Sequence, residues 1–157
     1  MLDPTIRYTA AQPSDAPAIA DLLEPYAEMG VVLPRPAGEI GEHIGNFLVA
    51  REVGEVLGAV ALRDFGDGLH EVRSLVVDSG CVGRGVGSQL IKAAVDLAIA
   101  RAARSVFTLT LRPGLFQRAG FELVDMERFP QKVWSDCAQC RKRHCCDEVA
   151  LLLSLEP

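Results

Sequence analysis

The sequence has no apolar run close to the roughly 18 residues that a membrane-spanning helix requires. Its start, Met1-Leu2-Asp3-Pro4, lacks the basic and then apolar layout of a secretory signal peptide. An excess of positive charge is missing too, because 16 Lys and Arg residues stand against 21 Asp and Glu residues, for a net charge of −5. These absences argue against a membrane protein, a secreted protein and a nucleic-acid-binding protein, and they predict a cytoplasmic one.

Internal repeats, low-complexity segments and linker-like stretches are also absent from the sequence. A composition of 49% hydrophobic and 24% charged residues is ordinary for a soluble protein, and 157 residues are enough to bury one sizeable core. We therefore expect a single domain over residues 1–157, with a cysteine-containing tail loop at 125–148 within it.

Most of the cysteines lie in that tail, where His144 accompanies Cys137, Cys140, Cys145 and Cys146. A Cys-x-x-Cys pair is half of a zinc-knuckle site, so a structural zinc is one interpretation. The usual second, well-separated pair is missing, which favours reduced thiols or an opportunistic disulfide, with a redox switch as a third interpretation. We expect the fifth cysteine, Cys81, to be a small apolar filler, because no His or acidic residue is patterned beside it.

Hydrophobic periodicity and turn residues predict an alternation of strands and helices. Strands are expected at 6–9, 47–52, 56–63, 69–77, 105–109, 121–124 and 149–155. Helices are expected from the N-cap Ser14 to Gly30, from Pro36 to Asn46, from Val86 onward, and over 115–119. This order predicts an α/β fold around one mixed central sheet of about six to seven strands flanked by helices. If the 69–77 strand is unbroken, its odd-numbered residues share one face: Leu69, Glu71, Arg73, Leu75 and Val77.

Three glycines at alternate positions separate the 69–77 strand from the following helix, in Val82-Gly83-Arg84-Gly85-Val86-Gly87-Ser88. Glycines let the backbone approach a ligand closely, and a helix N-terminus offers free N–H groups and a favourable dipole. The loop is therefore a candidate cradle for a phosphate-bearing molecule. A dinucleotide site needs G-x-G-x-x-G near the first strand, and a P-loop needs a Lys-Ser/Thr pair where this chain has Ser88-Gln89. A glycine-rich turn without a ligand is the remaining alternative.

The loop resembles the Q/R-x-x-G-x-G/A pyrophosphate loop of the GNAT acyltransferase superfamily, except that Val82 stands at the usual Gln or Arg position. A second motif, Leu115 to Phe121, is similar to the late signature of that superfamily, an aromatic residue four positions before a Gly-Phe pair. The resemblance runs from Ile6 to Leu155. Segments 30–35, 71–77 and 107–110 resemble the N-acetylglutamate synthases, especially the short bacterial kind, so we expect no upstream amino-acid-kinase-like domain.

The resemblance implies that acetyl-CoA is the acyl donor, with its pyrophosphate on the backbone N–H groups of the glycine loop. Arg84 adds a charge contact in this interpretation, with a solvated side chain as the alternative. The fourth and fifth strands splay apart in such folds, which leaves the N–H of Val77 to polarise the thioester carbonyl. The expected cofactor-binding residues are Leu75, Val76, Val77, Val82, Gly83, Arg84, Gly85, Val86, Gly87, Ser88 and Phe116.

The acceptor amine is mostly protonated at neutral pH, so a general base is needed, and Glu71 is the candidate for this role with Val77 as the second catalytic residue. An exposed strand carboxylate is the alternative for Glu71. His70 is the rival base because histidine titrates near neutral pH, but strand alternation turns it to the opposite face. Phe116 stands where many members have a tyrosine that protonates the leaving thiolate, so no general acid is identified. Packing against the CoA arm and plain core packing are both open for Phe116.

Arg73 and Arg35 are the expected substrate-binding residues, because a guanidinium can grip a carboxylate with two hydrogen bonds. A surface salt bridge is the alternative for each, and Arg112 and Lys132 are weaker candidates. The leading hypothesis is an N-acetyltransferase that acetylates the α-amino group of L-glutamate, toward arginine. The alternatives are acetylation of another small amine and a non-catalytic acyl-CoA-binding sensor. A homodimer is left open, and neither a nucleic acid nor a membrane is expected as a partner.

Overall fold

The computed structural model describes residues 5–29, 35–81, 83–125, 129 and 149–155. A seven-stranded mixed sheet in the order β1-β2-β3-β4-β5-β7-β6 lies at its centre. Neighbouring strands are antiparallel except for β4 and β5, which are parallel. The predicted α/β fold with a mixed sheet is confirmed. The strands are β1 (Arg7–Ala10), β2 (Phe47–Glu52), β3 (Glu55–Asp64), β4 (Leu69–Val77), β5 (Ser105–Thr110), β6 (Glu122–Val124) and β7 (Val149–Ser154).

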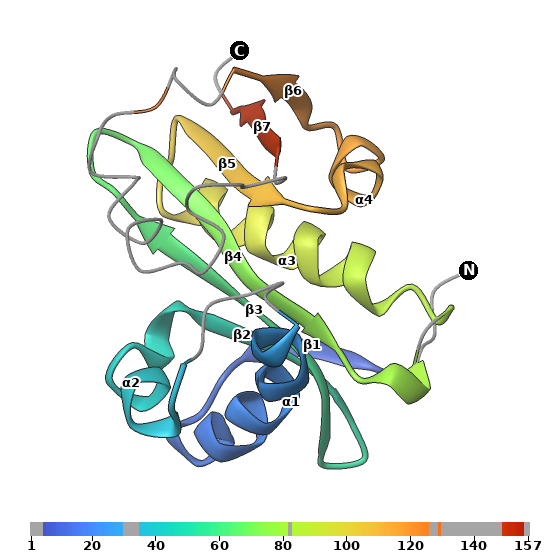
Figure 1. Cartoon of the computed structure of the whole chain (residues 1–157). Coiled ribbons are helices and arrows are strands. Elements are labelled where there is room, and N and C mark those ends of the chain that lie inside the picture. The colour runs from blue at the N-terminus through green and yellow to red at the C-terminus, as the bar shows by residue number, and fades with distance from the viewer. Residues whose placement is uncertain (1–4, 30–34, 82, 126–128, 130–148, 156–157) are drawn as a thin grey trace.

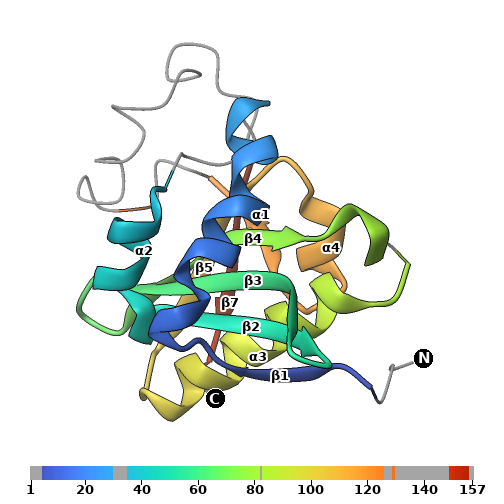
Figure 2. The same ribbon diagram turned by 90° about the horizontal axis from the view of Figure 1, so that it is seen from below.

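Helices cover both faces of the sheet (Figure 1 and Figure 2). On one face, α1 (Ala16–Glu28) and α2 (Ala37–Glu42) bury Ile19, Leu23 and Ile40 against alternate residues of β2 and β3. On the other face, α3 (Val86–Ala100) and α4 (Pro113–Gln117) bury a second core that includes Leu90 and Phe116. The alternating small and branched residues of the central strands therefore supply two cores, one per face.

The prediction that Ser14 caps the first helix is wrong. Residues Pro13–Asp15 form a 3₁₀ turn ahead of α1, and Asp15 is the buried member of that turn. Its carboxylate accepts hydrogen bonds from the Gln12 backbone N–H (2.8 Å) and from Nη2 of Arg51 on β2 (2.7 Å). The Asp15 carboxylate thus fixes the start of α1 through a local bond to Gln12, three residues earlier, and through a long-range ion pair with Arg51.

Asp15 makes the stability of the fold dependent on pH. Burial raises the pKa of the Asp15 carboxyl, but the hydrogen bonds from Arg51 and Gln12 and the charge of Arg51 lower it by more, so the pKa lies below 3.8. The stabilisation is present above the unfolded pKa and is lost as the pH falls through the folded one. We expect Asp15→Asn to lower the free energy of unfolding by about 1–3 kcal/mol near neutral pH.

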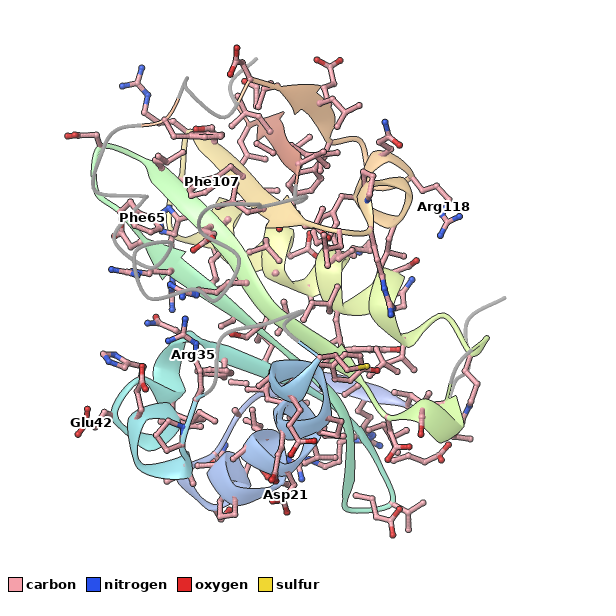
Figure 3. The ribbon with its side chains drawn as sticks, viewed as in Figure 1. Asp21, Arg35, Glu42, Phe65, Phe107 and Arg118 are labelled. Carbon is pink, nitrogen blue, oxygen red and sulfur yellow. The ribbon has the colours of Figure 1, made fainter. Side chains whose placement is uncertain are left out.

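Because the wild-type carboxyl also loses its charge in acid, this deficit is expected to shrink as the pH falls below 3.8. Urea titrations near neutral pH and at about pH 3 measure both values. The matched control is Asp21→Asn, an exposed acid on α1 that points away from the sheet in Figure 3. If Asp15→Asn lowered the free energy of unfolding by the same amount at both pH values, the pH dependence could not be assigned to Asp15.

A bulge in β4 changes which of its side chains share a face. Ser74 has a φ of 55°, and the pairing with β3 shifts by one residue between Ala61↔Arg73 and Ala59↔Val76. Before the bulge, Glu71 and Arg73 alternate with Val72, which packs in the core beneath α3, so both lie on the α1 face. After it, Leu75 and Val77 pack on the α3 side. The single shared face expected for an unbroken strand is therefore corrected to two faces.

The two parallel strands separate soon after they begin. β4 and β5 pair only from Leu69↔Ser105 to Glu71↔Phe107, and the Thr108 hydroxyl adds one bond to the Val72 carbonyl (2.9 Å). Among the described residues no ladder pair joins the strands beyond that point. The expected splaying of these two strands is confirmed.

Candidate active site

The glycine loop enters α3 with a backbone that can receive an anion. Gly83 and Gly85 have φ values of 91° and 77°, and a β-carbon at either position would meet no protein atom within 4 Å. The first helical bond runs from the Gln89 N–H to the Gly85 carbonyl (3.1 Å), so the N–H groups of the first turn have no acceptor inside the helix. An open, glycine-lined surface at the positive end of a 15-residue helix suits a phosphate group. Val82 lies outside the described residues.

Arg84 in this loop is anchored to the neighbouring strand. Its Nη1 lies 3.2 Å from Oε1 of Glu52, and its Nη2 lies 2.5 Å from Oε2. Glu52 ends β2 and also accepts a hydrogen bond from the Thr5 hydroxyl. The alternative interpretation of Arg84, a solvated side chain without a partner in the protein, is therefore excluded. Sequence reasoning missed Glu52, since the pair joins residues 32 positions apart and no local pattern marks it.

The end of β4, the first turn of α3 and α4 meet at one place. A β-carbon on Gly87 would lie 3.4 Å from Cδ2 of Leu115 and 3.8 Å from Cγ2 of Val77. Asp78 donates its N–H to the Leu57 carbonyl on β3 (2.7 Å). Because backbone groups alternate along a strand, the N–H and C=O of Val77 point the other way, toward the β5 side where pairing has ended.

Two of the residues expected to contact the cofactor, Val76 and Phe116, are buried in the two cores. Val76 is 2% exposed, packs in the α1-side core and pairs with Ala59, so it does not face the edge where the strands separate. Phe116 is 3% exposed and lies edge-on to Phe121, with ring centroids 5.4 Å apart. Its surroundings are those of a core residue. Leu115, which the sequence reasoning did not select, borders the glycine loop instead.

Glu71 and Arg73 form a buried pair on the α1 face. Glu71 is 8% exposed, and its Oε1 lies 3.4 Å from Nη1 of Arg73. Burial excludes the alternative of an exposed strand carboxylate. His70 lies on the opposite face, where its Nε2 is 3.9 Å from Oδ2 of Asp64. The predicted orientation of the two candidate bases is therefore confirmed.

Further arginines lie on the same face as Glu71. Arg63 is directly opposite Glu71 in the β3–β4 register, and its guanidinium carbon sits 4.5 Å from the centroid of the Phe65 ring. Arg35 precedes α2 and pairs with Glu39 (Nη1 to Oε1, 3.0 Å); in the view of Figure 3 it lies between α2 and Phe65. Sequence reasoning missed Arg63 because it ends an apolar run, and only the cross-strand register places it beside Glu71.

The remaining candidates contribute less to this site. Arg112 is exposed at the start of α4, and Lys132 lies outside the described residues. Cys81 is buried in the α3-side core, as expected for a small apolar filler. The tail cysteines also lie outside the described residues, and within the part of the chain that is described no group of three or more His, Cys, Asp or Glu residues could hold a metal. None of the described helices is long and apolar enough to cross a membrane.

Comparison with known sequences identifies similar proteins. A family model for the acetyltransferase (GNAT) domain matches residues 43–123, which include the glycine loop. An uncharacterized N-acetyltransferase of Chlorobaculum tepidum is 39% identical over 145 residues, which cover 92% of this chain and 94% of that protein. An amino-acid acetyltransferase of Mycobacterium tuberculosis is 30% identical over 118 residues, or 73% of this chain and 67% of that protein.

Comparison with solved structures identifies the same fold. A Mycobacterium tuberculosis protein in complex with CoA and NLQ has a TM-score of 0.83 and 25% identity, with 98% of this chain and all of that chain covered. N-acetylglutamate synthase from Neisseria gonorrhoeae, complexed with coenzyme A and N-acetyl-glutamate, has a TM-score of 0.87 at 23% identity. This chain spans 36% of that synthase, and the likeness between the two is one of fold.

Proposed function

This chain belongs to the acetyltransferase (GNAT) family, and we propose that it moves the acetyl group of acetyl-CoA to the α-amino group of L-glutamate. The observation that supports this acceptor most strongly is the buried Glu71–Arg73 pair on the face that also bears Arg35 and Arg63. One carboxylate among several arginines suits a molecule with one amine and two carboxylates. The amino-acid acetyltransferase of Mycobacterium tuberculosis, at 30% identity, supports an amino acid as the acceptor.

The donor is held by the glycine loop in this proposal. The pyrophosphate of acetyl-CoA accepts hydrogen bonds from the backbone N–H groups of residues 83 and 85–88, at the start of α3, since the N–H of Arg84 donates to the Cys81 carbonyl (3.2 Å). The pantetheine arm lies along the edge of β4 that β5 leaves, beside Leu75 and Leu115. The bound CoA in the similar Mycobacterium tuberculosis structure supports this assignment.

Gly85→Ala tests the phosphate cradle. A methyl group at this position meets no protein atom, so it adds only the strain of a positive φ to the free protein while it occupies the surface offered to the phosphates. We expect the Kd for CoA, measured by calorimetry, to rise about fivefold to tenfold. Gly54→Ala is the matched control, because Gly54 has a similar φ (83°) and open surroundings in the β2–β3 turn. An equal Kd in the two variants would remove the loop from the donor site.

The acetyl transfer itself uses groups along β4. Glu71, directly or through a water molecule, takes a proton from the ammonium group of the acceptor. The amine nitrogen then bonds to the thioester carbon and the carbon–sulfur bond breaks. Negative charge that develops on the carbonyl oxygen is stabilised by a backbone N–H on the edge of β4 that β5 leaves. Val77, six residues from Glu71 and beside Gly87, lies along the pantetheine arm nearer the phosphates. The nitrogen gives up its second proton to water as the amide forms, and the thiolate of CoA takes a proton from water, since Phe116 replaces the tyrosine expected at that position.

The acceptor carboxylates are bound by arginines in this proposal. Arg73 and Arg35 are half-buried and each is oriented by a carboxylate, Glu71 and Glu39 respectively. Partial burial strengthens the attraction between a guanidinium and a substrate carboxylate, because less water screens it.

A CoA-release assay with a panel of acceptors tests the function. We expect L-glutamate to give the highest kcat/KM among L-glutamate, L-aspartate, L-lysine and a polyamine. Reaction of aspartate, lysine or the polyamine without reaction of glutamate would contradict the proposal. Binding of CoA with no turnover of any acceptor would indicate a sensor of acyl-CoA instead.

A further inference from the structure

Arg84 ties the glycine loop to the sheet through its side chain. Of residues 83–85 it alone carries a side chain, because Gly83 and Gly85 stand on either side of it. Its guanidinium donates to both carboxylate oxygens of Glu52, from Nη1 to Oε1 at 3.2 Å and from Nη2 to Oε2 at 2.5 Å. A guanidinium that contacts both oxygens of a carboxylate is fixed in direction as well as in distance, so this pair restricts where the loop can lie.

Glu52 is itself held in place. It ends β2 opposite Glu55, and its Oε2 also accepts a hydrogen bond from the Thr5 hydroxyl. The turn that follows contains Val53 and Gly54 with φ values of 47° and 83°, the left-handed geometry of a tight hairpin. The side chain of Glu52 is 26% exposed and that of Arg84 is 31% exposed, so water screens this pair less than it screens an ion pair on the open surface.

The backbone of Arg84 is engaged as well. Its N–H donates to the carbonyl of Cys81, which is buried in the α3-side core, and the Cys81 N–H donates to the Asp78 carbonyl at 2.9 Å. Arg84 therefore joins the turn that leaves β4 to the end of β2. Its two glycine neighbours have φ values of 91° and 77° and no side chain to restrict them, so the anchor at Arg84 limits the conformations open to both.

We propose that Glu52 is a positioning residue for the donor, which holds Arg84 so that the N–H groups of residues 83 and 85–88 keep the arrangement that receives the pyrophosphate. In this proposal the Arg84 guanidinium binds Glu52 and not a phosphate. A loop that is ordered before binding loses less conformational freedom on binding, which raises affinity without a new contact. The pair also neutralises the charge of Glu52, which would otherwise repel the phosphates. The inference rests on the proposed donor site and not on the identity of the acceptor.

Removal of either partner distinguishes this role from direct phosphate binding. Glu52→Met and Arg84→Met each break the pair with a side chain of similar length that forms no ion pair. We expect each variant to raise the Kd for CoA, measured by calorimetry, about threefold to tenfold. The double variant is expected to bind no more weakly than the weaker single variant, because both changes remove one interaction. If Arg84 contacted the phosphates, Glu52→Met would leave the Kd unchanged or lower it, and that result would overturn the proposal.

A donor without phosphates separates positioning from a general structural effect. S-acetyl-pantetheine carries the thioester and the pantetheine arm but no pyrophosphate. With the acceptor that the wild-type enzyme uses best, we expect Glu52→Met to raise the KM for acetyl-CoA about threefold to tenfold and to keep kcat within about twofold. The kcat/KM for S-acetyl-pantetheine is expected to stay within about twofold of the wild-type value. An equal loss with both donors would refute the positioning role, because the pair would then support the fold as a whole.

Lys92→Met is the matched control, because it breaks an exposed ion pair with Asp96 (3.3 Å) further along α3 and is expected to keep the wild-type Kd for CoA. These outcomes differ from a failure of the proposed function. If the wild-type protein binds no CoA, the donor site and the positioning role are both refuted. If it binds CoA and acetylates no acceptor, the acetyl transfer is refuted, and the Kd values of the variants still decide the positioning role.

Discussion

Glu71→Gln is expected to lower kcat/KM for the acceptor by about 10²- to 10⁴-fold, the range over which general bases contribute. The amide is nearly the same size as the carboxylate and can still accept a hydrogen bond from Arg73, so the buried site keeps its packing. It cannot take the proton of the acceptor's ammonium group. The KM for acetyl-CoA stays within about twofold, because the phosphates of the donor bind at the glycine loop, at the other end of β4.

The pH dependence of this variant makes the test sharper. As the pH rises, more of the acceptor amine is already deprotonated, so the deficit of Glu71→Gln relative to the wild type is expected to shrink. Rates of CoA release from mildly acidic to alkaline pH measure this. The matched control is Glu42→Gln, an exposed acid on α2. A deficit that stays constant over the whole pH range would rule out Glu71 as the base.

Arg73→Lys is expected to raise the KM for glutamate by about 10- to 100-fold, the factor that corresponds to losing a charge-assisted hydrogen bond. Lysine preserves the positive charge beside Glu71 and therefore the ion pair that supports the base. It lacks the planar fork with which a guanidinium grips both oxygens of a carboxylate. The change therefore affects recognition of the acceptor more than the proton transfer.

Initial-rate kinetics with each substrate varied in turn measure this separation. The KM for acetyl-CoA is expected to stay within about twofold of the wild-type value. Arg118→Lys is the matched control, because Arg118 is exposed beside α4 and points outward in Figure 3. A glutamate KM equal to that of the control would show that Arg73 pairs with Glu71 for stability alone.

The arrangement of the elements could be predicted from the sequence because its signals are local. β2 and β4 have the predicted bounds, since a turn-forming glycine or a change of periodicity marks each end. The glycine loop was predicted to open a helix, and α3 begins at Val86. GNAT membership also followed from two motifs that keep their order along the chain.

The features that could not be predicted from the sequence depend on contacts between residues far apart in the chain. The bulge at Ser74 places a non-glycine residue at positive φ inside a strand, where no turn residue announces it. The bonds from Tyr26 to Val77 and from Arg84 to Glu52 span 51 and 32 positions. They exist only because helix α1 and strand β2 fold against the end of β4 and the glycine loop.

The ratio of kcat/KM for L-glutamate to that for L-glutamine tests the central claim most directly, since the two acceptors differ in one side-chain carboxylate. If the arginines on the Glu71 face recognise that carboxylate, glutamate is preferred by about tenfold or more. The rates can be measured by CoA release, with the acetylated product identified by mass spectrometry. A glutamine value equal to or higher than the glutamate value would contradict the account.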